Sequence, residues 1–122
     1  MEKIFKNKYL EEIPVEERSM YFLIKVHGEF TIRSLISVRK RIEEALEKGH
    51  LYIVFDLSNT IYMDSSVIGL LINVDRKLKE RTGGIHLINP NSRILESVEI
   101  FNIKFPIHNS IEQADKKIGW DD

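Results

Sequence analysis

The stretch DLSNTIYMDSSVIGLLINVDRKL, residues 56–78, decides the fold because a strand pattern changes to a helix pattern within it. It overlaps Leu51–Leu57 (LYIVFDL), a nearly continuous apolar run typical of an interior strand covered on both faces. From about Ser65 to Arg81, apolar residues recur at three- and four-residue steps, which predicts a helix that ends before Gly83-Gly84. The apolar run Ile85–Asn89 then predicts another strand. This order predicts a right-handed crossover between two parallel strands.

The strand and helix patterns continue on both sides of this stretch. Tyr21–Val26 (YFLIKV) is rich in aromatic and branched residues, which predicts a strand. Helical spacing begins near Thr31 and ends near Gly49, and Thr31 or Ser34 is the expected N-cap. The expected downstream elements are a helix from Asn91 or Ser92 to about Ile100, a strand at Phe105–His108 and a helix at Ser110–Ile118.

Strands that alternate with helices predict an α/β fold. We expect a single domain over residues 1–122, with a central mixed β-sheet of about four to five strands and helices packed mainly on one face. Residues 1–20 form a charged N-terminal segment, in which a short edge strand is expected around Tyr9–Val15.

The composition of the chain restricts its class. Its 122 residues fit one domain, and a formal net charge of −1 does not point to nucleic acid or to an acidic membrane as a partner. The absence of cysteine excludes disulfides, thiolate metal ligands and cysteine nucleophiles. No signal peptide is recognisable, and no apolar run approaches the roughly 20 residues that span a bilayer. We therefore expect a soluble cytoplasmic protein without a membrane span.

The junction at Asp64, Ser65 and Ser66 has two interpretations. All three are good helix N-cap residues, so the simplest interpretation is a structural cap. The second is a regulatory one, because a serine at a helix start can carry a phosphate that the positive end of the helix dipole tolerates. Such a phosphate would place charge beside a binding surface without unfolding the domain.

The helix that follows is more apolar than a surface helix needs. Its stripe at helical spacing is enough to bury one face against the sheet, and consists of Val67, Leu71, Val74 and Leu78. Ile68 and Ile72 lie off that stripe, which indicates either deeper burial or a partner surface. Gly69 stands inside the helix, where glycine usually has a close-packing reason.

The sequence does not predict an enzyme. The serines at the junction are not flanked by the glycines of the G-x-S-x-G nucleophile elbow. His27, His50, His86 and His108 show no metal-binding or catalytic spacing. Gly83-Gly84 closes a helix, whereas phosphate-binding glycines precede one. We therefore expect no catalytic residue, no metal and no cofactor.

Two motifs give the chain a family resemblance. Asp56-Leu57-Ser58, followed by Met63-Asp64-Ser65-Ser66-x-x-Gly69, resembles the signature of STAS domains, the family of sulphate transporters and anti-sigma factor antagonists. Gly28-Glu29 after the first strand is similar to a second element of that family, and the order of strands and helices matches over nearly the whole chain.

The resemblance implies an anti-sigma factor antagonist. Such proteins bind an anti-sigma factor that is also a serine kinase, and so free the sigma factor. The kinase phosphorylates the serine directly after the signature acid, here Ser65, which ends the binding, and a phosphatase restores it. The resemblance also implies a monomer or weak dimer, with partner-binding residues Thr31, Asp64, Ser66, Val67 and Ile68.

Two positions depart from the family pattern. Val67 stands where glycine is usual, and Thr31 stands where the Gly-Glu element usually has aspartate. These departures favour an alternative function, in which the chain is a phosphorylation-independent STAS module: a scaffold, a sensor or an accessory to a membrane transporter.

Overall fold

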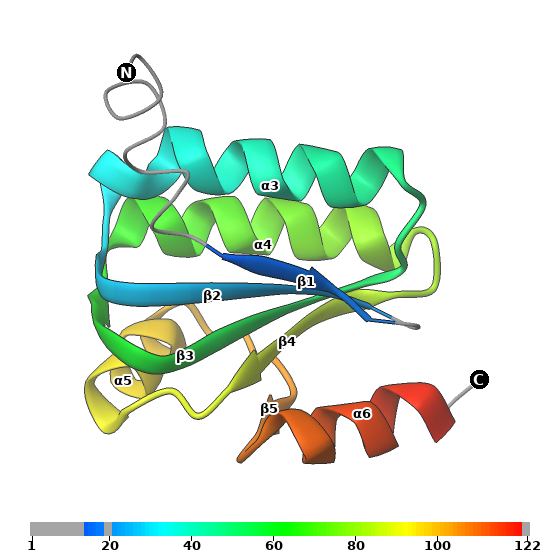
Figure 1. The fold of residues 1–122 in the computed structure, drawn as a ribbon. Helices are drawn as coiled ribbons and strands as arrows, with labels where there is room; N and C mark the ends of the chain where they lie inside the picture. The colour runs from blue at the N-terminus through cyan, green and yellow to red at the C-terminus, as the bar shows by residue number, and fades with distance from the viewer. Residues whose placement is uncertain (1–13, 19–20, 121–122) are drawn as a thin grey trace, which may run out of the picture.

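The computed structural model describes residues 14–18 and 21–120, and shows a five-stranded sheet with helices on both faces (Figure 1). The strands lie in the order β1-β2-β3-β4-β5, with β1 antiparallel to β2 and the other neighbours parallel. The elements are β1 Val15–Glu17, β2 Tyr21–Phe30, the 3-10 helix η1 Ile32–Ser34, α3 Leu35–Glu47, β3 Tyr52–Met63, α4 Ser65–Lys79, β4 Gly84–Ile88, α5 Ser92–Ile100, β5 Ile107–His108 and α6 Ile111–Trp120.

The predicted α/β fold with a mixed sheet is confirmed, and the differences concern element ends. An edge strand is present, but it is Val15–Glu17, and residues 9–13 of the predicted range lie outside the described residues. β3 continues six residues beyond the predicted end at Leu57, to Met63, because it stays paired with β2 there. β2 likewise runs past Val26, through two register shifts and the positive φ of Gly28.

The main core lies between the sheet and the helices α3, α4 and α5. Phe22, Ile24, Ile53 and Phe55 point to this side, and all four are fully buried. α3 and α4 lie along one face of the sheet in Figure 1, while α6 lies on the other. The expectation that helices pack mainly on one face is therefore confirmed, with α6 as the exception.

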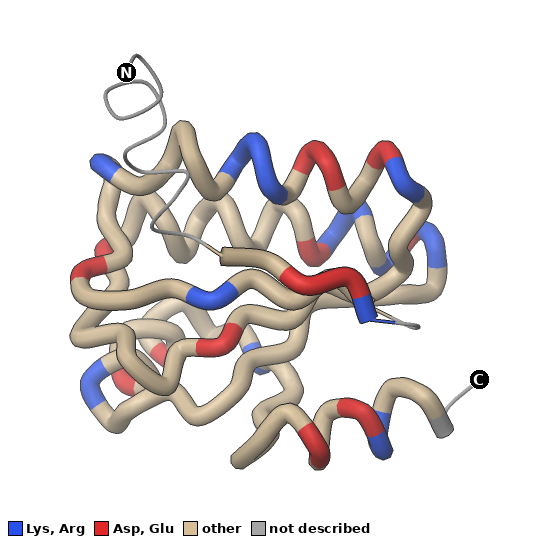
Figure 2. Tube along the Cα trace, viewed as in Figure 1, with Lys and Arg blue, Asp and Glu red and all other residues tan. Residues whose placement is uncertain are grey.

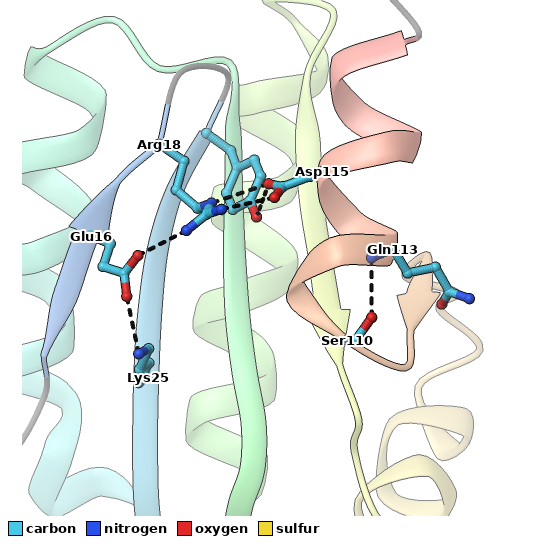
Figure 3. A network of polar contacts seen from close by, with 7 residues as sticks. Glu16, Arg18, Lys25, Ser110, Gln113 and Asp115 are labelled. Carbon is cyan, nitrogen blue, oxygen red and sulfur yellow. Dashed lines mark hydrogen bonds and ion pairs between the residues drawn. The ribbon is translucent and has the colours of Figure 1, made fainter.

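α6 covers a smaller core on the opposite face. Its Ala114 and Ile118 are buried against side chains from three strands: Tyr21, Leu23, Val54 and Ile88. Figure 3 shows the polar contacts beside this core. Asp115 of α6 accepts hydrogen bonds from Arg18 Nη2 at 2.8 Å and from the Tyr21 hydroxyl at 2.8 Å. These contacts join α6 to Arg18, which follows β1, and to Tyr21, the first residue of β2.

The charged residues of the described chain are mixed over its surface. Along α3 the basic positions Arg39, Lys40 and Arg41 come before the acidic positions Glu43, Glu44 and Glu47, so one helix carries both signs (Figure 2). Within residues 14–18 and 21–120, no helix is both long and apolar enough to cross a membrane. The same residues contain no group of three or more His, Asp or Glu side chains placed to hold a metal ion.

Candidate functional site

The Asp64 junction lies where β2 and β3 end side by side. The two strands are parallel, so their carboxyl ends meet at the same edge of the sheet, with Phe30 opposite Met63. The backbone N–H of Asp64 donates to the carbonyl of Phe30 at 3.1 Å. α4 therefore begins beside η1 and the start of α3.

Both carboxylate oxygens of Asp64 hold this junction together. Oδ1 accepts hydrogen bonds from the Val67 N–H at 3.1 Å and from the Ser66 hydroxyl at 2.7 Å, so Asp64 is the N-cap of α4. Oδ2 accepts from the N–H of Ile32 at 3.0 Å. Partial burial raises the pKa of Asp64, but these hydrogen bonds outweigh it and lower the pKa below its usual value.

The two serines have different surroundings, although both are exposed. The Ser66 hydroxyl is used in the cap through its bond to Asp64. The Ser65 hydroxyl makes no hydrogen bond with any described residue, and Ser65 is the first residue of α4. The four first N–H groups of a helix and its dipole favour negative charge at this position. Ser65 thus offers an accessible hydroxyl whose modification breaks no hydrogen bond of the described fold.

Thr31 and Ser34 shape the neighbouring turn. The Thr31 Oγ1 accepts from the N–H of Arg33 at 3.3 Å and caps η1. Ser34 is the N-cap of α3 but makes no side-chain cap bond, since its hydroxyl donates to the Glu29 carbonyl at 3.4 Å. Thr31 is half-buried and precedes Ile32, whose N–H binds Asp64. By capping η1, Thr31 helps to hold this turn in place beside Asp64.

Val67 and Ile68, two of the expected partner-binding residues, do not offer their side chains at the surface. Their side chains are 0% and 1% exposed and belong to the main core. The physical reason is that the side chains of α4 join one core with those of the sheet and of α3, so α4 buries apolar residues on more than one side. Of the two alternatives for Ile68, deeper burial is therefore the one observed.

Exposed apolar side chains do occur around the junction, at positions that the sequence reasoning missed. Ile32 is 64% exposed, Ile36 is 76% exposed and Ile61, three residues before Asp64, is 53% exposed. Ile32 and Ile36 line a groove of about 350 Å³ along the start of α3, together with Leu35, Arg39 and Glu43. One sequence pattern could have indicated this: Ile32 and Ile36 are four residues apart, and neither belongs to the set of residues that α3 buries.

Gly69 does not have the close-packing role that its place in the helix suggested. A Cβ added at Gly69 would meet no atom within 4 Å. The glycine therefore leaves open space on the half-buried side of α4, one turn after Ser65.

Comparison with known proteins gives consistent matches. A family model described as STAS domain matches residues 12–114. The anti-sigma-B factor antagonist of Staphylococcus aureus (strain NCTC 8325 / PS 47) is 23% identical over 96 residues, which cover 79% of this chain and 89% of that protein.

Solved structures show the same fold. A candidate anti-sigma factor antagonist of Thermotoga maritima has a TM-score of 0.80 at 19% identity, covering 91% of this chain and 97% of that one. The unphosphorylated form of the anti-sigma factor antagonist SpoIIAA has a TM-score of 0.80 at 20% identity. The match covers 88% of this chain and 96% of SpoIIAA. SpoIIAA of Bacillus in its phosphorylated form has a TM-score of 0.71 at 23% identity, covering 87% and 98%.

Proposed function

Since the chain belongs to the STAS domain family, we propose that it is an anti-sigma factor antagonist controlled by phosphorylation at Ser65. In this proposal it is a binding protein and not an enzyme: it binds an anti-sigma factor that is also a serine kinase, and a phosphatase reverses the modification. The names of its relatives in Staphylococcus aureus support the general role. The observation that carries the switch is the exposed hydroxyl of Ser65 at the start of α4, which makes no hydrogen bond with a described residue.

The proposed switch acts on binding and leaves the fold intact. A phosphoserine adds about −1.5 to −2 charges. At Ser65 these charges would lie at the favourable end of the α4 dipole, so the domain would stay folded. They would also lie beside the Asp64 carboxylate and near the exposed Ile32, where burying a doubly charged group against apolar surface is costly.

The proposed partner surface combines apolar and polar groups. Ile32, Ile36 and Ile61 supply the apolar contacts, because they are the exposed large apolar residues that flank the junction in η1, α3 and β3. Asp64 and Ser66 supply polar groups between them. Thr31, Val67 and Ile68 contribute indirectly, by holding η1 and α4 in place.

Phosphorylation is tested by mass. The purified protein, the anti-sigma factor kinase of the same cell and ATP are mixed, and intact masses are measured for wild type, Ser65→Ala and Ser66→Ala. We expect one phosphate on wild type and on Ser66→Ala, and none on Ser65→Ala. A phosphate that persists on Ser65→Ala would contradict the assignment of the acceptor.

The effect of negative charge on partner binding is tested by placing an aspartate at position 65. Ser65→Asp should weaken binding to the anti-sigma factor in calorimetry. Ser92→Asp is a matched control, because Ser92 is likewise the exposed first residue of a helix whose N-cap, Asn91, accepts from an N–H three residues on. It should bind like wild type. If wild type stays unmodified and Ser65→Asp binds normally, the phosphorylation-independent scaffold, sensor or transporter-accessory module is the better description.

A further inference from the structure

Two histidines from neighbouring strands are buried together on the α6 side of the sheet. His86 of β4 and His108 of β5 are 8% and 5% exposed, and their ring planes lie 18° apart. Nδ1 of His86 is 2.8 Å from Nε2 of His108, which is a hydrogen-bond distance. His86 lies two residues before Ile88 of the smaller core, and His108 pairs with Ile88, so both rings face the same side as that core.

This contact restricts where the protons of the histidine pair lie. One of the two nitrogens must donate and the other must accept. If Nδ1 of His86 donates, His108 accepts at Nε2 and, when neutral, carries its own proton on Nδ1. If Nε2 of His108 donates, His86 accepts at Nδ1 and carries its own proton on Nε2. Two neutral rings therefore have the same tautomer.

The histidine pair tolerates one added proton but not two. A single imidazolium can donate to the neutral ring across the same contact, so the first added proton keeps the hydrogen bond. A second one would place an N–H on both facing nitrogens and two positive charges on adjacent rings. Because both rings are buried, water does not solvate those charges unless β5 or α6 moves.

The groups that face the histidine pair do not offset this cost. From β3, the Tyr52 ring meets His86 edge-on, with centroids 5.5 Å apart, and brings no negative charge at neutral pH. From α6, Lys117 adds positive charge. Burial is the larger cause and the Lys117 charge the second, and both lower the pKa of His108. The carboxylate of α6 that contacts the strands, Asp115, is bound to other side chains.

We propose that the His86–His108 contact is a pH-sensitive switch, which holds β5 and α6 on the sheet at neutral pH and releases them in mild acid. β5 has two residues and pairs with β4 alone, and one of the two is His108. α6 packs on β4 and β5. Breaking the contact therefore weakens the attachment of both elements, while the long pairing of β2 with β3 does not depend on it.

The sign of the pH dependence follows from the excluded proton. In mild acid two free histidines take up two protons, whereas the folded pair takes up only one. Stability therefore falls as the pH drops below the unfolded histidine value near 6.5. One excluded proton raises the unfolding equilibrium constant about tenfold per pH unit. Carboxylates titrate near pH 4, so their contribution lies in a separate window.

The switch leaves the proposed phosphorylation site intact. The hydrogen bonds of Asp64 keep its pKa below the usual value, so its carboxylate stays ionised in mild acid and continues to cap α4. Mild acid thus opens the α6 side of the sheet while Ser65 keeps its place at the start of α4. This inference does not depend on the proposed function and is tested without a partner.

NMR of the ring nitrogens tests the contact in the unaltered protein. Long-range nitrogen–proton spectra of the full-length chain at pH 7 report the tautomer of each histidine. We expect His86 and His108 to have the same tautomer, and the fold to be lost locally before both rings become protonated. Opposite tautomers would overturn the proposal. So would two doubly protonated rings with unchanged amide signals from β5 and α6.

Variants that keep a hydrogen-bonding amide but cannot titrate test the excluded proton. His108→Gln is compared with wild type and with His27→Gln, a matched control because His27 is exposed on β2. Between pH 6 and pH 5, the unfolding equilibrium constant from urea denaturation should rise about tenfold more for wild type and His27→Gln than for His108→Gln. Equal rises in all three would overturn the proposal. His86→Asn gives the same comparison if His108→Gln does not fold.

Amide hydrogen exchange locates the opening. After correction for the intrinsic effect of pH on exchange, protection in wild type should fall at β5 and α6 between pH 7 and pH 5, and persist at β2 and β3. His108→Gln should keep α6 protected at both pH values. Protection that falls equally over the whole sheet would overturn the proposal, because the histidine pair would then control global unfolding instead of releasing β5 and α6.

Discussion

The carboxylate of Asp64 binds the backbone N–H of Ile32 at 3.0 Å, across 32 residues of sequence. Because its other oxygen caps α4 through Val67, a single side chain fixes the start of α4 relative to η1. The family's signature acid therefore has a structural task here that is separate from any regulation. It holds the hydroxyl of Ser65 and the exposed side chain of Ile32 in one surface.

Removing the Asp64 carboxylate should destabilise the domain. Asp64→Ala loses the α4 cap, which contributes about 1 kcal/mol, and the bond to Ile32, which contributes about another 1 kcal/mol. We expect a loss of roughly 2 kcal/mol in the free energy of unfolding, measured by urea denaturation. Ser65→Ala is the control and should change it by less than about 0.5 kcal/mol, since the Ser65 hydroxyl is exposed and bonds to none of the residues that the structure describes. Equal losses in the two variants would show that the cap does not act as described.

Buried and exposed positions of α4 should differ in how much a substitution by alanine changes the free energy of unfolding. Leu71 is 0% exposed in the main core, so Leu71→Ala should cost about 2–5 kcal/mol. Asn73 is exposed on the same helix, and Asn73→Ala should change stability by no more than about 0.5 kcal/mol. Thermal and urea unfolding of both variants measure this. A loss below about 1 kcal/mol for Leu71→Ala would mean that the stripe is not packed as described.

Alanine at Gly69 and alanine at Gly83 should change the stability of the domain in opposite directions. A Cβ at Gly69 meets no atom within 4 Å, so Gly69→Ala should stabilise the domain by up to about 1 kcal/mol. A Cβ at Gly83 would overlap the Leu51 carbonyl oxygen, so Gly83→Ala must displace backbone and should be strongly destabilising. Melting temperatures measure both effects. If Gly69→Ala is stable but binds the proposed anti-sigma factor partner less well, the open space at Gly69 serves partner approach.

The sequence predicted the sheet and its crossovers because periodicity reports which residues face the core. It also predicted the cap of α4, because aspartate at a strand-to-helix junction has few other local uses. It could not predict the contact between Asp64 and Ile32, since that depends on how far β2 and β3 run beside each other. The choice between burial and a partner surface for Ile68 stayed open, and the exposure of Ile36 was missed, for a similar reason: each depends on how α3 and α4 pack, which one helix's pattern does not determine.

The contact between α6 and β2 predicts a pH dependence of stability. The hydrogen bond from Arg18 is the largest cause and lowers the pKa of Asp115; burial opposes it, and the hydrogen bond from the Tyr21 hydroxyl lowers the pKa further. Because the pKa of Asp115 is lower in the folded state than in the unfolded one, its contribution is complete above the unfolded value near 4. It is lost as the pH falls through the folded value.

Asp115→Asn therefore should cost stability at neutral pH and much less in acid. The Arg18 and Asp115 side chains are 31% and 40% exposed, so solvent screening limits the effect to about 1 kcal/mol. Urea unfolding at pH 7 and at pH 3 measures the difference between wild type and variant at each pH. Glu112→Gln is the control, because Glu112 is exposed on the same helix and forms no ion pair within the described residues. A wild-type advantage over Asp115→Asn that grows as the pH falls would contradict this account, because only a raised folded pKa gives that sign.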